Sequence, residues 1–212
     1  VVKTPYSMLS GHLFLVAMVA RIYQPGCLMR TMPILEGVQY RGKSSALRVL
    51  GGEWFCDTPL NLSNKDSYQI IQGVWLYEIA ELDAFNRSES TAIKAWVSST
   101  KDRFRAPYDR APRDWLRQVI FAGSTNQEEY FKDASGNTRF WPWKVEASGE
   151  PINLQGLSEA RDQLFAEAVA LYKAGERWHP TSDEQRQLFA PEQEEREIGD
   201  AWLPIITRWL RN

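Results

Sequence analysis

A glycine-rich octapeptide constrains this chain more than any other feature of its sequence. Residues 37–44 read Gly-Val-Gln-Tyr-Arg-Gly-Lys-Ser, a complete G-x-x-x-x-G-K-[ST] pattern. The apolar pair Ile34 and Leu35 precedes it, and residues 45–50 continue it as a helical pattern that stops at two glycines. A strand, a glycine-rich loop and a helix in this order favour a phosphate-binding loop over the alternative, a chance turn in front of a helix.

Each residue type in this loop has a chemical role in a nucleotide site. Gly37 and Gly42 let the backbone bend so that its N–H groups face phosphate oxygens. Lys43 would reach the β- and γ-phosphates, and the hydroxyl of Ser44 would bind Mg²⁺. The residues expected to contact nucleotide are Gly37, Val38, Gln39, Tyr40, Arg41, Gly42, Lys43, Ser44 and Ser45.

Length and composition allow one sizeable core. The 212 residues are 43% hydrophobic, and the apolar run at 13–20 is too short to cross a membrane, so we expect it to be a buried helix face. Two cysteines and two histidines are too few for a disulfide framework or a zinc cluster. The start lacks a signal-peptide pattern and an initiator methionine, which suggests a piece of a longer protein in a reducing cytoplasm, with no membrane partner.

The formal charge of −2 is unevenly spread. Residues 1–157 hold 18 basic and 16 acidic side chains, whereas residues 158–212 hold 7 and 11. Within the first part, residues 101–117 carry six bases and three acids. Pro107 and Pro112 exclude one uninterrupted helix there, so a loop or a hairpin is expected.

Hydrophobic periodicity predicts strands that alternate with helices. The expected strands are 31–35, 54–56, 74–77, 118–123 and 138–143, and the expected helices are 6–23, 45–50, 65–72, 88–97, 157–174, 183–189 and 202–210. This order predicts an α/β three-layer sandwich with a mainly parallel sheet, in which Pro142 lies in an edge strand. The expected division is a helical N-terminal segment (1–30), an ATPase core (31–157) and a helical C-terminal extension (158–212).

Two acids near the run 74–77 are candidates for the second acid that nucleotide hydrolysis requires. Glu78 follows the run directly, and Glu81 comes three residues later. Either carboxylate could hold Mg²⁺, directly or through water, and orient the attacking water, which is a Walker B role. The usual signature has two adjacent acids, whereas Ile79 and Ala80 intervene here, so both acids stay candidates. The alternative is a pair of solvated acids at a strand end.

Two later polar residues could complete such a site. Asn126 follows the strand expected at 118–123, where its amide could bond the γ-phosphate or the lytic water; an ordinary turn is the alternative. Arg139 is a candidate trigger arginine, supplied in trans to the γ-phosphate of a neighbouring subunit. A structural salt bridge is the alternative for Arg139.

The basic segment offers candidate contacts to a nucleic-acid backbone. It lies between the two acids and Asn126, where a ring-shaped translocase could place a pore hairpin. The candidate nucleic-acid-binding residues are Lys101, Arg103, Arg105, Arg110 and Arg113. A solvated basic loop, or a loop that contacts ATP, is the alternative.

Taken together, these motifs closely resemble the virulence-associated protein E family. They are residues 37–45, Trp-Leu-Tyr-Glu-Ile-Ala-Glu-Leu at 75–82, Ile-Lys at 93–94, Arg-Ala-Pro-Tyr at 105–108, Phe-Ala-Gly-Ser-Thr-Asn at 121–126 and Asp-Ala-Ser-Gly-Asn-Thr-Arg-Phe-Trp-Pro at 133–142. The resemblance covers nearly the whole chain. That family, found in phages, satellites and genomic islands, is similar to superfamily 3 helicases of the AAA+ P-loop NTPase type, often as the helicase part of a primase-helicase.

The resemblance implies a function and its partners. It implies hydrolysis of ATP with Mg²⁺, a homo-hexameric ring, single-stranded or forked DNA as a partner, a primase domain in the same full-length protein, and replication of a mobile element. Tyr40 and Arg41 depart from the small residues that are common in such loops. Bulky side chains there can point outward, and Arg41 could also touch nucleotide.

The resemblance also assigns roles by position. The matching catalytic residues are Lys43, Glu78 or Glu81, Asn126 and Arg139, and the metal ligands are Ser44 with Glu78 or Glu81. Spacing to the Ile-Lys pair favours Glu81, whereas the strand-end position favours Glu78. The favoured interpretation is an ATP-hydrolysing DNA translocase or helicase domain. The alternatives are an ATPase switch that remodels a protein partner and a nucleotide-binding assembly module.

Overall fold

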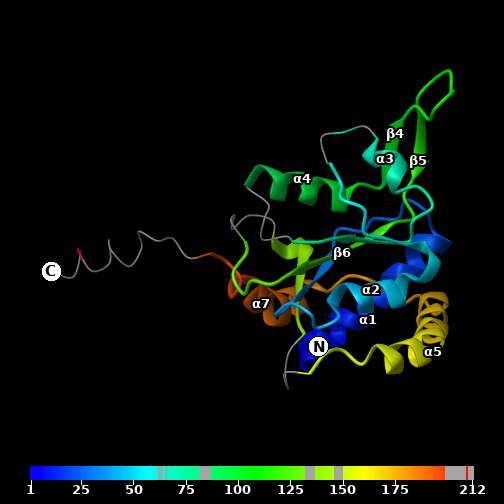
Figure 1. Cartoon of the computed structure of the whole chain (residues 1–212). Coiled ribbons are helices and arrows are strands. Elements are labelled where there is room, and N and C mark those ends of the chain that lie inside the picture. Colours follow the sequence, from blue (N-terminus) through cyan, green and yellow to red (C-terminus); the bar gives the residue numbers. More distant parts are fainter. Residues whose placement is uncertain are drawn as a thin grey trace.

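Figure 1 shows the computed structural model of the chain, which describes residues 1–61, 64, 66–81, 87–131, 137–145, 150–198 and 209, with the backbone alone at 87–90. Five strands form its central sheet: β1 (Met32–Glu36), β2 (Phe55–Cys56), β3 (Leu76–Ile79), β6 (Ile120–Thr125) and β7 (Phe140–Lys144). Their order is β2-β3-β6-β1-β7, and every pairing is parallel. The segments that follow β1, β3 and β6 therefore meet at one end of the sheet.

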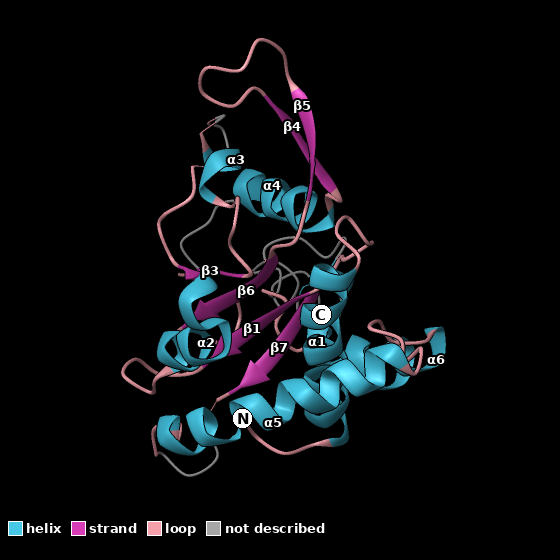
Figure 2. Ribbon diagram, turned by 90° about the vertical axis from the view of Figure 1, so that its right-hand side faces the viewer, coloured by secondary structure: helices cyan, strands magenta, loops and turns pink. Residues whose placement is uncertain are grey.

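Helices cover both faces of the sheet, which confirms the predicted α/β class with a mainly parallel sheet (Figure 2). One face carries α1 (Pro5–Tyr23), α2 (Lys43–Gly51) and α5 (Leu154–Lys173). The other face carries α3 (Ser67–Ile70) and α4 (Arg87–Ser98). The remaining helical elements are η1 (Gly52–Trp54), η3 (Asn137–Arg139), α6 (Ser182–Glu184), the π-helical η4 (Gln185–Phe189) and α7 (Ala190–Glu194).

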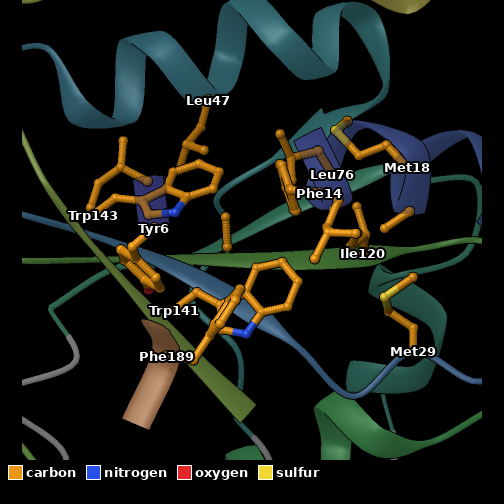
Figure 3. Close-up of a cluster of buried hydrophobic side chains, with 14 of the residues drawn as sticks. Tyr6, Phe14, Met18, Met29, Leu47, Leu76, Ile120, Trp141, Trp143 and Phe189 are labelled. Atoms are coloured by element: carbon orange, nitrogen blue, oxygen red, sulfur yellow. The ribbon is translucent and has the colours of Figure 1, made fainter. Parts of the chain in front are cut away.

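Alternate side chains of the strands feed two hydrophobic clusters. The cluster under α1 and α2, shown in Figure 3, takes from the strands Leu35, Leu76, Ile120, Ala122, Trp141 and Trp143. The cluster under α4 takes Met32, Ile34, Tyr77, Ile79, Phe121 and Phe140. Because side chains along a strand alternate between faces, this pattern places Glu78 and Ser124 on the α2 side of the sheet.

Two strands lie two residues later than the periodicity predicts. The strand expected at 74–77 is β3 at Leu76–Ile79, and the one expected at 118–123 is β6 at Ile120–Thr125. Glu78 therefore lies within β3, one residue before its carboxyl end, and does not follow the strand directly. A buried glutamate can occupy a central strand because hydroxyl groups satisfy its carboxylate, as described below. Apart from Trp209, the helix expected at 202–210 lies outside the described residues.

Helix α1 confirms the buried helix face expected at 13–20, but the apolar helix is longer than that run. Residues 5–23 are long and apolar enough to cross a membrane by length and hydropathy, although 56% of that stretch is buried inside the fold. Tyr6, Leu13 and Phe14 belong to the same cluster as Leu35 and Leu47. Helix α1 thus packs as a core helix against the sheet.

A two-stranded hairpin projects from this sandwich on the side of α3 and α4 (Figures 1 and 2). It consists of β4 (Lys101–Phe104) and β5 (Arg113–Leu116), paired antiparallel. The sequence predicts a loop or a hairpin at this place, and the structure confirms the hairpin. Pro142 lies in β7, which is an edge strand as expected.

Candidate functional site

The glycine-rich loop joins the carboxyl end of β1 to the first turn of α2. Gly37 and Gly42 have φ angles of 142° and 83°, which side chains with a Cβ rarely adopt. Tyr40 also has a positive φ of 63°, and its side chain is 96% exposed, so this bulky residue does point outward. The loop conformation therefore depends on the two motif glycines.

The loop ends at the first turn of helix α2, whose N–H groups precede the helical hydrogen bonds. Gly42 is the N-cap, and the first helical hydrogen bond runs from the N–H of Ala46 to the carbonyl of Gly42 at 2.8 Å. The N–H groups of Lys43, Ser44 and Ser45 come before that bond and have no partner within the helix. Together with the positive end of the helix dipole, they form an environment that suits an anion.

Lys43 is held inside this loop. Its side chain is buried, and its ammonium donates to the carbonyls of Gly37 and Val38, the latter at 2.9 Å. A third hydrogen bond of 2.9 Å goes to Oδ1 of Asn126, which follows β6. An ammonium has three protons, and these contacts use all of them. The structure thus brings two predicted site residues, Lys43 and Asn126, into direct contact.

Glu78, in strand β3, lies next to the start of α2. Its side chain is 2% exposed, and its Oε1 accepts hydrogen bonds of 2.7 Å from the hydroxyls of Ser44 and Ser124. Its other oxygen, Oε2, is buried and has no hydrogen-bond partner among the described residues. An unpaired buried carboxylate oxygen is costly, and a hydroxyl beside a carboxylate is the donor set that Mg²⁺ prefers. The hydroxyl of Ser44 and the carboxylate of Glu78 therefore have the chemistry expected of ligands to Mg²⁺.

Glu81 occupies a different position from Glu78. It is exposed and has a positive φ of 54°, just beyond the end of β3. Within the described part of the chain, its carboxylate forms no hydrogen bond with Ser44 or the loop. Glu78 and Glu81 both line a cavity of about 400 Å³ whose other lining residues include Asp57 and Tyr77. Of the two candidate acids, the geometry brings Glu78 to Ser44.

Arg139 lies at the opposite end of the sheet from the loop. It precedes β7, whose first residue Phe140 pairs with Met32 at the start of β1, whereas the loop follows the end of β1. Five strand residues at about 3.3 Å each separate the two ends by roughly 16 Å. Arg139 donates to the hydroxyl of Ser98 at 2.9 Å. It does not join the loop of its own chain.

The bases of the hairpin fall into two groups. Three are paired with acids: Lys101 and Arg103 contact Asp114 at 2.6 and 2.9 Å, and Arg113 contacts Asp109 at 3.4 Å. The hydrogen bonds from Lys101 and Arg103 lower the pKa of Asp114 below its ordinary value. Surface pairs of this kind are weak, and the two acids, of which Asp114 serves both Lys101 and Arg103, offset two of the three positive charges.

The tip of the hairpin carries bases of the second group. Arg105 and Arg110 are exposed, and the described residues include no acid in contact with either. Tyr108 lies between them, fully exposed at 105% and with a positive φ of 67°. The free positive charge of the hairpin is therefore concentrated at its tip, beside an exposed aromatic ring.

Arg117, which the local charge count includes among the bases, is not part of that surface. Its side chain is 1% exposed and forms a buried ion pair with Asp102 at 2.6 Å. Its guanidinium also lies over the ring of Trp96, 4.9 Å from the centroid. Arg117 precedes the start of β6, so the hairpin arises at the end of the sheet opposite the glycine-rich loop. The alternative that this segment contacts ATP bound in its own chain does not fit that position.

Sequence reasoning missed two contributors to the site. Ser124, inside β6, reaches Glu78 from the neighbouring strand. The sequence feature that could have indicated this role is a hydroxyl residue two positions before Asn126. Glu36, directly before the loop, pairs with buried Arg196 from beyond α7 and accepts a hydrogen bond from Tyr130 at 3.3 Å. Burial, and then the charge of Glu36, raise the pKa of Tyr130. This pair fixes the end of β1 where the loop begins.

Comparison with known proteins identifies relatives of this fold. Two solved structures of the NrS-1 C terminal region, one covering residues 305–718, match with TM-scores of 0.52 and 0.51 at 15% and 14% identity. The matches cover 92% and 93% of this chain but 48% and 46% of those chains, so the chain spans about half the length of the structures it resembles. None of the curated proteins searched matches the chain. The family of virulence-associated protein E-like domains matches residues 1–198, and the chain belongs to that family.

Proposed function

We propose that this chain is the ATP-hydrolysing DNA translocase or helicase domain of a phage or mobile-element replication protein, with a P-loop NTPase core of AAA+ or superfamily 3 type. The observation that carries this proposal is the convergence of Lys43, Asn126, Ser44 and Glu78 at the carboxyl end of a parallel sheet. Ligands of open α/β sheets bind in that place. Family membership and the resemblance to superfamily 3 helicases support the same interpretation.

The loop supplies the groups that phosphates require. The N–H groups in the first turn of α2 would bind phosphate oxygens, and Lys43 would neutralise the charge on the β- and γ-phosphates. Lys43 now donates to loop carbonyls and to Asn126, so nucleotide would replace these acceptors with phosphate oxygens. Asn126 would then be free to bond the γ-phosphate or the attacking water.

Glu78 is the better candidate for the acid that works with the metal. Mg²⁺, when bound, would neutralise phosphate charge and hold water. Ser44 would be its ligand from the loop, and Glu78 would hold it directly or through water. Oε2 of Glu78, which has no hydrogen-bond partner in the described part of the chain, is the oxygen available for that purpose. Glu81 stays the alternative acid, since it lines the same cavity as Glu78.

The position of Arg139 supports an assembly in which neighbours share sites. Arg139 and the loop lie at opposite ends of one sheet, so head-to-tail subunits would bring the Arg139 end of one near the loop of the next. A guanidinium there would stabilise negative charge that develops on the γ-phosphate. We therefore propose a closed ring of identical subunits, a hexamer by resemblance.

The hairpin would contact DNA through its tip. Arg105 and Arg110 have exposed guanidinium groups for backbone phosphates, and Tyr108 has an exposed ring on which a base could stack. Lys101, Arg103 and Arg113 are weaker candidates because acids already pair with them. Single-stranded or forked DNA is the proposed partner.

One observation favours a second function, an ATPase that remodels a protein partner. An apolar cavity of about 450 Å³ opens between α1 and α5, and its lining includes Tyr23, Trp54 and Trp75. Tyr23 and Trp54 are 55% and 50% exposed, which is unusual for large aromatic side chains unless a partner covers them. On this alternative, nucleotide turnover would not depend on DNA.

The deciding experiment is the rate of ATP hydrolysis with and without single-stranded DNA over a range of protein concentrations. Turnover that rises with DNA and steepens with concentration supports the translocase. DNA-independent turnover supports the remodelling ATPase. Nucleotide binding without turnover under every condition would leave a binding module and overturn the enzymatic proposal.

A further inference from the structure

One carboxylate oxygen of Glu78 is shared by two serine hydroxyls. Ser44 reaches Oε1 from the start of α2, and Ser124 reaches the same atom from β6, each at 2.7 Å. All three side chains lie between the sheet and α2, and Ser124 is only 6% exposed. Ser44 belongs to the glycine-rich motif, whereas Ser124 has no role in that motif.

Strand register explains how Ser124 reaches Glu78. Glu78 of β3 lies opposite Ala122 of β6, and Ser124 is the next residue of β6 on the same face. Diagonal neighbours of this kind are within reach of a glutamate side chain. The contact therefore depends on the pairing of two central strands, and a shift of one residue would turn Ser124 to the other face.

The two hydroxyls determine which oxygen of Glu78 is left to act. Each carboxylate oxygen has about two acceptor sites, and Ser44 with Ser124 fill those of Oε1. Oε2 is buried, and no described side chain or backbone group forms a hydrogen bond with it. Any water or metal that approaches Glu78 therefore meets Oε2. If the hydroxyl of Ser124 were absent, Ser44 alone would hold the carboxylate of Glu78, and that carboxylate could rotate.

We propose that Ser124 is a positioning residue, which orients the carboxylate of Glu78 so that Oε2 faces the water or metal used in hydrolysis. This inference rests on the proposed function, because it assigns Ser124 a part in the same reaction. Ser44 alone cannot orient the carboxylate, because a single hydrogen bond does not fix the rotation of a carboxylate group. Ser124 is the second point of attachment.

The test compares Ser124→Ala with the wild-type chain in DNA-stimulated ATP hydrolysis. A hydrogen bond to a charged group is lost, so we expect kcat to fall by about 10-fold to 100-fold. Binding of a fluorescent ATP analogue in the presence of Mg²⁺ should change by less than about twofold, because the loop is untouched. Ser124→Thr, which keeps the hydroxyl, should recover much of the turnover.

A double-mutant cycle separates positioning from a merely structural role. If Ser124 acts through Glu78, then Ser124→Ala should cost nothing further in a Glu78→Gln background. Ser10→Ala is the matched control, since Ser10 is another buried serine, which accepts a hydrogen bond of 2.8 Å from the indole N–H of Trp143 and has no contact with Glu78 among the described residues. It should lower thermal stability by a similar amount without a selective loss of kcat.

The outcomes distinguish this inference from the proposed function. If the wild-type chain does not hydrolyse ATP, the proposed function fails, and the inference fails with it. If the wild-type chain is active and Ser124→Ala turns over equally fast, the inference alone is overturned. Additive losses in the cycle would also overturn it, because Ser124 would then act independently of Glu78.

Discussion

The amide oxygen of Asn126 accepts a hydrogen bond from the ammonium of Lys43 across 2.9 Å, which joins the end of β6 to the start of α2. Nucleotide would compete for both partners, because Lys43 would turn to phosphate oxygens and release the amide. The contact thus couples the group proposed to bind phosphate to the group proposed to sense it.

We expect Lys43→Ala to abolish ATP hydrolysis while the chain stays folded. Loss of one preorganised positive group opposite developing charge costs about 100-fold to 1,000-fold in rate. Lys43 donates to carbonyls of its own loop and to Asn126, so circular dichroism and the unfolding midpoint should change little. Undiminished turnover in the purified variant would contradict the assignment of the loop.

Substitutions of Asn126 should separate binding from turnover. Asn126→Ala removes the sensor amide and should lower kcat with little change in nucleotide affinity. Asn126→Asp would put a carboxylate beside Lys43, so the ion pair would hold Lys43 and repel phosphate, and affinity should fall by about tenfold. Gln127→Ala, which alters the neighbouring exposed amide, is the control. Equal affinities for all three variants would argue against the coupling.

Mixed assemblies test the proposed sharing of sites. Arg139→Ala and Lys43→Ala should each be inactive alone, whereas a mixture should recover some activity, because an intact loop then meets an intact Arg139 from a neighbour. Ser98→Ala is the control, since it removes the observed partner of Arg139 but keeps the guanidinium. Silence of every mixture, with assembly confirmed by light scattering, would count against action in trans.

Local patterns were sufficient to predict the loop and most elements. The octapeptide at 37–44 contains its own turn, and glycines and prolines separate the helices and strands that follow. The position of Glu78 was harder to predict, because the boundary of β3 depends on its pairing with β6 and not on the apolar run alone. The contact of Glu78, and not Glu81, with Ser44 therefore depends on tertiary structure.

Partnerships between strands could not be derived from a single sequence. Ser124 looks like an ordinary strand-end hydroxyl until the register places it diagonally from Glu78. Arg117 looks like Arg113, yet it is buried against Asp102, since the hairpin folds that position inward. In both cases the chemistry of the residue is set by a neighbour that is distant along the chain.

The salt dependence of DNA binding should identify the bases that contact phosphates. Arg105→Ala and Arg110→Ala should each reduce the slope of log affinity against log salt by about one. Arg103→Ala should reduce it less, because Asp114 already neutralises Arg103. Tyr108→Ala should weaken binding to single strands without a change of slope, since stacking releases no counterions. Identical slopes for all four variants would refute contact through the hairpin tip.

The buried pair of Asp102 and Arg117 should determine the stability of the hairpin base. Asp102→Ala would leave the guanidinium of Arg117 buried without its carboxylate, which costs about 3–5 kcal/mol in the free energy of unfolding. Asp109→Ala removes an exposed partner of Arg113 and should cost at most about 1 kcal/mol. Denaturant unfolding of both variants measures the difference.

The double variant Asp102→Leu/Arg117→Met should recover most of the lost stability, because the penalty comes from the unpaired charge and not from the missing attraction. A double variant as unstable as Asp102→Ala would show that Arg117 matters through its other contacts, to Trp96 above all.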